Sequence, residues 1–198
     1  MKLFFEKANI DVKGSISDNM TEKEFFSFCH QNENLRIERD EEGQIFIMAP
    51  TSSETGNKNF KIAAEIALWN KAQQSGVAFD SSTGFTLTDN SILSPDVSWM
   101  RNEKWNVISK KDKEGFAHVC PDFVIELKSK SDNLNYLKNK MHKWIKNGCS
   151  LGWLINIESS VVLIFRKDGT VDKVSGFQNN ISGEDVLPGF QLDLNILK

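Results

Sequence analysis

Features that mark secreted, membrane and zinc-stabilised proteins are scarce in this sequence. It has only three cysteines, Cys29, Cys120 and Cys149, which lie far apart and form no CxxC pair. An odd, scattered set of thiols is typical of a reducing compartment and argues against disulfides and structural zinc. The three histidines form no HxxxH or HExxH pattern, so a histidine-based metal site of that kind is not indicated.

Long hydrophobic runs are also missing. No purely apolar run is longer than Val161–Phe165, whereas a membrane-spanning helix needs roughly 18 apolar residues. The first residues contain neither the extended apolar region nor the small-residue cleavage site of a signal peptide. We therefore expect a cytoplasmic protein that has no membrane partner.

Positive charge is not in excess, because 24 Lys and Arg stand against 27 Asp and Glu, for a formal net charge of −3. This balance argues against a strongly cationic nucleic-acid-binding protein. Hydrophobic residues make up 39% and charged residues 26%, which is typical of a globular protein and excludes collagen-like and disordered classes. The length of 198 residues indicates one domain, or at most two small ones.

The order of the predicted elements indicates an α/β protein. TEKE at 21–24 is a capping box that starts a short helix. Ile62, Ile66 and Trp69 share one face of a second helix, and a third helix is expected from about 132 to 146. Strands are expected at 35–38, 44–48, 77–79, 84–88, 92–100, 123–127, 153–157, 161–166 and 171–174.

No repeat, low-complexity tract or linker divides the chain. Residues 1–19 are interpreted as an N-terminal extension and residues 20–198 as a single domain. The polar segment 101–117 is interpreted as a loop or a mobile helix. A helix between two strands of one sheet favours a right-handed crossover, and therefore a mixed central sheet flanked by helices.

Two segments carry the residues best suited to chemistry, SPDVSW at 94–99 and PDFVIELK at 121–128. Strand alternation in the second segment places Glu126 and Lys128 on one face, about 6.6 Å apart. If the two strands are neighbours, Asp96 approaches Glu126 across the sheet. Two carboxylates beside a lysine suit Mg²⁺ or Mn²⁺ and phosphodiester hydrolysis. The pattern alone leaves a structural ion pair on a solvated face of the sheet as an alternative.

The order PD…ExK followed by a helix resembles the PD-(D/E)xK nuclease superfamily. Further segments resemble, in the same order, the Uma2 family of endonucleases, and the resemblance covers nearly all of residues 20–198. It implies a restriction-endonuclease-like α/β core and Mg²⁺-dependent cleavage of DNA. The segments are MTEKEFFSF, IFIMAPTSSETG, GFTLTDNSILSPDVSWM, PDFVIELKSKSD, MHKWIKNGCSLGWLINI and LPGFQLDLNIL.

The resemblance also implies roles for individual residues. Asp96 matches the aspartate of the PD motif, Glu126 the second acidic residue and Lys128 the motif lysine. Asp96 and Glu126 would hold the metal ion with the backbone carbonyl of Leu127, and Lys128 would position the attacking water. Glu54 matches an additional acidic position, although a first-turn glutamate favoured by the helix dipole is an open alternative.

Contacts to nucleic acid are expected from lysines after the acidic strand. Lys140 matches a basic position common in the helix that follows this strand and could contact phosphate, although a solvated helix lysine is the alternative. Lys130 belongs to a concentration of positive charge over residues 128–146, which could follow a phosphate backbone. The net charge of −3 therefore does not exclude a DNA substrate.

The leading interpretation is a divalent-metal-dependent DNA endonuclease. A catalytically silent nucleic-acid-binding or interaction module on the same fold is the main alternative, and a nuclease acting on RNA or structured DNA is another. A homodimer is expected from the resemblance alone.

Overall fold

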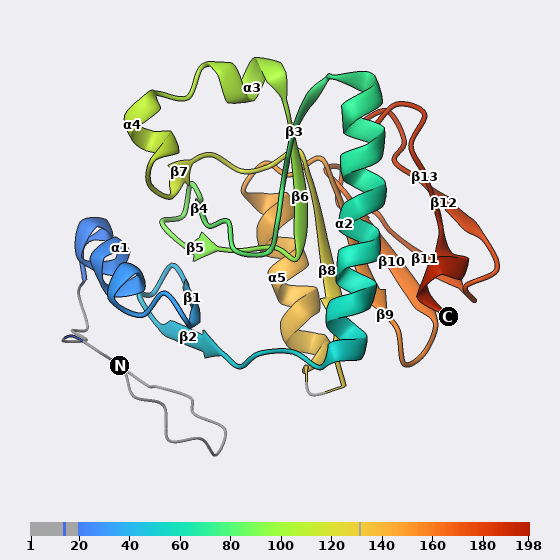
Figure 1. Ribbon diagram of the computed structural model, residues 1–198, viewed down its shortest axis with the longest axis horizontal. Helices are drawn as coiled ribbons and strands as arrows, with labels where there is room; N and C mark the ends of the chain where they lie inside the picture. Colours follow the sequence, from blue (N-terminus) through green and yellow to red (C-terminus); the bar gives the residue numbers. More distant parts are fainter. Residues whose placement is uncertain (1–13, 15–19, 131) are drawn as a thin grey trace. The chain divides into compact units, whose positions relative to one another are not determined.

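The computed structural model describes residue 14, residues 20–130 and residues 132–198 (Figure 1). Apart from Gly14, the predicted N-terminal extension lies outside the described residues. The chain divides into two compact units. Among the described residues, the first unit comprises 14, 20–50, 84–94 and 108–119, and the second comprises 51–83, 95–107, 120–130 and 132–198. The single domain expected over 20–198 stays a prediction.

The first unit contains a small sheet and a capped helix. Helix α1 (Glu22–Gln31) begins with the predicted capping box, in which the Thr21 side chain accepts a hydrogen bond from the Glu24 amide and the Glu24 carboxylate accepts one from the Thr21 amide. Its buried Phe25 and Phe28 pack with apolar residues of the sheet. The sheet has the order β2-β1-β5-β4-β7. The bounds are β1 Arg36–Arg39, β2 Ile45–Met48, β4 Phe85–Thr86, β5 Ile92–Leu93, β7 Ala117–His118 and α4 Lys110–Lys113.

The second unit is built on a six-stranded mixed sheet with the order β11-β10-β9-β8-β6-β3. Strands β8 and β9 are parallel and are connected through α5, whereas the other neighbours are antiparallel. The predicted mixed sheet flanked by helices is thus confirmed. The bounds are α2 Ser53–Gln73, β3 Gly76–Phe79, β6 Val97–Arg101, α3 Asn102–Asn106, β8 Phe123–Lys128, α5 Leu134–Lys146, β9 Leu151–Asn156, β10 Val161–Arg166, β11 Val171–Ser175, β12 Asn180–Ser182, β13 Gln191–Asp193 and η1 Leu194–Leu197.

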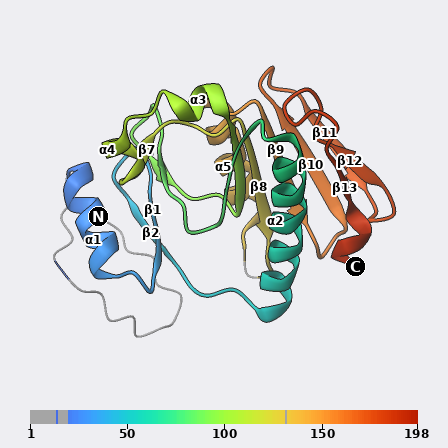
Figure 2. The same ribbon diagram turned by 45° about the horizontal axis from the view of Figure 1, so that its top comes forward.

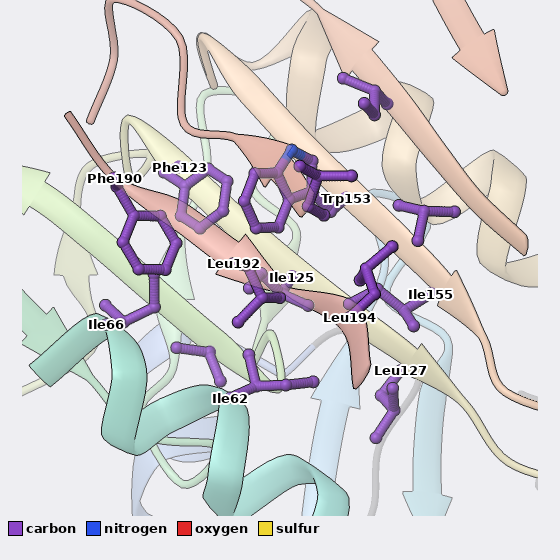
Figure 3. Packing of buried hydrophobic residues seen from close by; sticks show 14 of the residues in the cluster. Ile62, Ile66, Phe123, Ile125, Leu127, Trp153, Ile155, Phe190, Leu192 and Leu194 are labelled. Carbon is purple, nitrogen blue, oxygen red and sulfur yellow. The ribbon is translucent and has the colours of Figure 1, made fainter. Parts of the chain in front are cut away.

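Strand β8 is buried along its whole length, between α2 on one face and α5 on the other (Figures 1 and 2). Phe123, Ile125 and Leu127 point into the main core, which Ile62 and Ile66 of α2 complete (Figure 3). Successive side chains of a strand alternate between its faces. Glu126 and Lys128 therefore project to the opposite face from this core, as the sequence predicts.

Helix α5 approaches the sheet closely because β9 has a glycine beneath it. A Cβ atom at Gly152 would collide with the Met141 side chain and crowd Val124. The buried residues of α5 are Leu137, Lys140, Met141 and Trp144, which share one face of a helix by their spacing. Position 140 of this apolar face is occupied by a lysine.

The strand predicted at 92–100 is wrong as one element. It is interrupted at residues 94–96, so that β5 belongs to the sheet of the first unit and β6 to that of the second. Pro95 lies at the interruption and lacks the N–H group that a sheet ladder requires. The segment 101–117, expected as a loop or mobile helix, contains the short helices α3 and α4 and begins β7.

The remaining predicted helices and strands are confirmed to within a few residues. The sequence did not predict β7, β12 and β13, which have two or three residues each and are too short to show alternation. None of the helices in the described part of the chain combines the length and apolar character needed to cross a bilayer.

Candidate functional site

Asp96 forms two hydrogen bonds with the backbone of β8. Its backbone amide donates to the carbonyl of Ile125 at 3.0 Å, and its carboxylate Oδ2 accepts from the amide of Leu127 at 2.7 Å. These two partners are the residues on either side of Glu126. Because β6 and β8 are neighbouring strands, the predicted approach of Asp96 to Glu126 across the sheet is confirmed.

Glu126 is almost completely buried, with 2% of its surface exposed. Its Oε1 atom accepts hydrogen bonds from Nζ of Lys140 at 2.9 Å and from Nε1 of Trp144 at 3.0 Å. Both donors come from α5, where residues four positions apart lie one above the other on the same face. A buried carboxylate is stable only when it is paired and hydrogen-bonded, and α5 meets both requirements.

The motif lysine has different partners. Lys128, 8% exposed, donates through Nζ to the carbonyl of Ser129 at 2.9 Å, and its Nζ lies 3.5 Å from Oε2 of Glu158. The solvated face of the alternative interpretation is wrong, because α5 covers this face of β8, but Glu126 does take part in an ion pair. The cationic partner that the structure gives Glu126 is Lys140.

Lys140 is therefore not the solvated helix lysine that the sequence left open. It is 6% exposed and directs its ammonium group to Glu126. A signal for this orientation exists in the sequence, since position 140 falls within the apolar stripe formed by Leu137, Met141 and Trp144. Lys130, in contrast, is exposed and is accessible to a binding partner from solvent.

Glu54 lies in the first turn of α2 with its side chain exposed, and its Oε1 is 3.1 Å from Nζ of Lys58. The hydrogen bond from Lys58 lowers the pKa of Glu54, and the charges of Lys58 and Lys130 lower it further. Lys58 was missed by sequence reasoning. It is buried on the same face of α2 as Ile62 and Ile66, which places its stem against the main core.

Asp122 has a role of its own at the start of β8. Its Oδ1 lies 3.1 Å from Nε of Arg101 and 3.3 Å from Nζ of Lys104, and its Oδ2 accepts a hydrogen bond from the Arg101 amide. The carboxylate is buried. Asp122 thus pairs with two basic residues, Arg101 at the end of β6 and Lys104 in α3.

The oxygen donors near Asp96 fit a divalent cation that keeps part of its water shell. Mg²⁺ binds through one or two carboxylates and retains several waters, and the Asp96 carboxylate accepts a hydrogen bond from the amide of Leu127, the residue that follows Glu126. Within residues 14, 20–130 and 132–198, no three His, Cys, Asp or Glu side chains form a group that could hold a metal ion. That Asp96, Glu126 and the carbonyl of Leu127 are the metal ligands stays a prediction.

The second unit is an α/β fold in which Asp96 is hydrogen-bonded to β8, the strand that carries the buried Glu126. The crystal structure of a "putative nuclease belonging to DUF820" from Anabaena variabilis is similar to the chain with a TM-score of 0.72. The match has 18% sequence identity and covers 90% of this chain and 97% of that one. This likeness confirms the predicted fold.

The Uma2 family model, described as "Putative restriction endonuclease", matches residues 22–195. The chain therefore belongs to the Uma2 family, as the resemblance of its motifs predicts. A search among curated proteins finds no match.

Proposed function

We propose that the protein is an endonuclease that hydrolyses phosphodiester bonds of DNA with the help of Mg²⁺ or Mn²⁺. The observation that carries this proposal is the position of Asp96, whose two hydrogen bonds to β8 lie on either side of Glu126. Membership of a family of restriction-endonuclease type supports a nucleic-acid substrate.

Each residue has a distinct part in the proposed reaction. Asp96, Glu126 and the carbonyl of Leu127 would hold the cation, which would supply Lewis-acid stabilisation of the charge that develops on phosphorus. Lys128 orients the water whose oxygen attacks phosphorus, while the P–O bond to the leaving sugar oxygen breaks and solvent water protonates that oxygen. Glu54 belongs to the proposal as an additional ligand or as the base that accepts the proton of this water.

We assign DNA binding to an exposed lysine that follows β8 in the sequence. Lys130 is exposed and lies close enough to the first turn of α2 for its charge to act on Glu54. Replacing Lys130 by Ala should weaken DNA binding uniformly across sequences and reduce the slope of log affinity against log salt by about 1.

A homodimer and a cytoplasmic location complete the proposal. Two copies would supply one centre for each strand of a duplex, and analytical ultracentrifugation at several concentrations tests this stoichiometry. Cys29, Cys120 and Cys149 are free thiols, as expected in a reducing compartment.

Cleavage of a supercoiled plasmid and of single- and double-stranded DNA and RNA oligonucleotides tests the activity. With Mg²⁺ or Mn²⁺ we expect the wild type to nick the plasmid, and Asp96→Asn and Glu126→Gln to be at least 100-fold slower. The matched control is Glu103→Gln, an exposed glutamate in α3, which should retain full activity. Nicking by Glu126→Gln at the wild-type rate would overturn the proposed centre.

One observation favours the alternative of a silent nucleic-acid-binding module. The charge of Glu126 is already balanced by Lys140, so the fold does not require a cation at this position. Calorimetric titration with Mn²⁺ separates the two functions. A module without catalysis would bind no Mn²⁺ at millimolar concentrations, whereas the proposed nuclease binds it and loses that binding in Glu126→Gln.

A further inference from the structure

We propose that Trp144 and Lys140 are positioning residues that fix the orientation of the Glu126 carboxylate for the divalent cation. This inference rests on the proposed function and extends it to two side chains that act through Glu126. It also replaces the contact between Lys140 and phosphate that the sequence suggests, because the ammonium group is directed to a carboxylate in the interior.

The geometry gives both donors the same acceptor atom. Nζ of Lys140 and Nε1 of Trp144 lie 2.9 Å and 3.0 Å from Oε1 of Glu126. All three side chains are buried, so water does not compete for this oxygen. Two donors from one rigid helix, converging on one oxygen, restrict rotation of the carboxylate about its terminal bond.

A second buried tryptophan, Trp153, provides a comparison for the hydrogen bond of Trp144. Trp153 of β9 is also fully buried, and its Nε1 has no hydrogen-bond partner among the described residues. Burial of an indole in this unit thus does not by itself supply a partner for the N–H group. The indole of Trp144 is instead placed so that its single donor meets the motif glutamate.

Donors that orient a metal-binding side chain contribute to metal affinity, and their loss typically costs about 10- to 100-fold. Trp144 is the cleaner residue to test, since replacing it removes a donor and leaves the charge of the site unchanged. Lys140 contributes both a donor and a charge. Its replacement by Arg keeps both, whereas replacement by Gln removes the charge.

The experiment is a calorimetric Mn²⁺ titration of the full chain in the wild type, Trp144→Phe and the matched control Trp153→Phe. Both variants exchange a fully buried indole for a phenyl ring, but only the first removes a hydrogen bond to Glu126. We expect Trp144→Phe to weaken Mn²⁺ binding about 10-fold or more, and Trp153→Phe to remain within about 2-fold. Circular dichroism establishes that each variant is folded.

Cleavage as a function of Mn²⁺ concentration provides a second readout. For Trp144→Phe, the half-saturating Mn²⁺ concentration should rise by the same factor as the dissociation constant, while the rate at saturating Mn²⁺ recovers most of the wild-type value. A change confined to the saturating rate would overturn a positioning role. If Trp144→Phe does not fold, Lys140→Gln and Lys140→Arg are compared instead. Lys140→Arg should retain at least half of the free energy of Mn²⁺ binding that Lys140→Gln loses.

The possible failures are distinguishable. If the wild type binds Mn²⁺ and cleaves DNA, but Trp144→Phe binds Mn²⁺ as tightly as Trp153→Phe, the inference alone is overturned. If the wild type neither binds Mn²⁺ nor cleaves DNA, the proposed function fails, and the inference fails with it.

Discussion

The ammonium nitrogen of Lys140 lies 2.9 Å from Oε1 of Glu126, and both side chains are almost completely excluded from solvent. This pair crosses from α5 to β8, the strand at the centre of the proposed nuclease site. A pair in the interior differs from a surface ion pair, which typically contributes no more than about 1 kcal/mol. Removal of one partner from a buried pair leaves an uncompensated charge.

The first prediction concerns the stability of the metal-free protein. Lys140→Met should lower the free energy of unfolding by about 3 kcal/mol, because Glu126 then stays buried without its cationic partner. Urea denaturation measures the change. Lys146→Met, which alters an exposed lysine of the same helix, should change it by less than about 0.5 kcal/mol. The double variant Lys140→Met with Glu126→Gln should recover part of the loss, and an equal loss in the double variant would contradict the explanation.

The second prediction concerns the motif lysine. Lys128→Met should reduce the rate of DNA cleavage by about 100-fold, as expected for loss of a group that orients the attacking water. Its affinity for Mn²⁺ should stay within about 3-fold of the wild type, because Lys128 does not contact Glu126 through any hydrogen bond or ion pair found in the described structure. Single-turnover cleavage and calorimetry measure the two quantities.

Glu158→Gln is the control for Lys128, since the two side chains form an ion pair at 3.5 Å. If Lys128 serves only this pair, both variants should cleave DNA equally fast. The proposed role requires Glu158→Gln to retain most of the wild-type rate.

The third prediction separates Asp122 from the proposed centre. Asp122→Asn should destabilise the fold by about 1 to 3 kcal/mol, because its buried carboxylate loses charged hydrogen bonds to Arg101 and Lys104. The affinity for Mn²⁺ should not change. Asp172→Asn is the matched control, because Asp172 also pairs with an arginine but has a side chain that is 66% exposed. That change should cost less than about 1 kcal/mol, and an equal effect of the two would contradict the argument from burial.

The fourth prediction is a pH dependence. Burial raises the pKa of the Cys29 thiol from 9.0 to about 12, against the opposing charge of Arg39. The folded protein therefore keeps this thiol protonated at a pH where the unfolded chain has already released the proton. The contribution of the protonated Cys29 thiol to the free energy of unfolding is fully present below about pH 9 and is lost as the pH rises toward 12.

Urea denaturation between pH 8 and pH 10.5 measures this effect. Cys29→Ala should show a shallower loss of unfolding free energy with rising pH than the wild type. In the same range the thiol of the native protein should react slowly with iodoacetamide, and identical pH profiles for the two proteins would contradict the assignment.

Much of the fold follows from local patterns in the sequence. The capping box of Thr21 and Glu24 fixes the start of α1, since both of its reciprocal hydrogen bonds involve residues three positions apart. The alternation in β8 predicts which side chains enter the core, because a strand presents successive residues to opposite faces. The motif order also predicts that Asp96 and β8 are neighbours, which the hydrogen bond to Leu127 confirms.

Features that depend on distant partners could not be predicted. Pro95 is a local signal for the interruption, but nothing in the sequence around it shows that the two strands belong to different sheets. The partner of Glu126 was expected from within its own strand, whereas it comes from α5. A lysine-rich helix offers several candidates, and the sequence signal that distinguishes Lys140 is its place in the apolar stripe of α5.

The division of the chain into two units limits which fragments of this protein can be produced by truncation. The six segments alternate between the two units, so the polypeptide passes from one to the other five times. Neither unit is encoded by a continuous stretch of gene. Asp96 and Glu126 belong to the second unit, yet residues 108–119 of the first stand between them in sequence. No truncation can therefore isolate the two acidic residues together from the first unit, and point substitutions are the appropriate way to dissect the proposed centre.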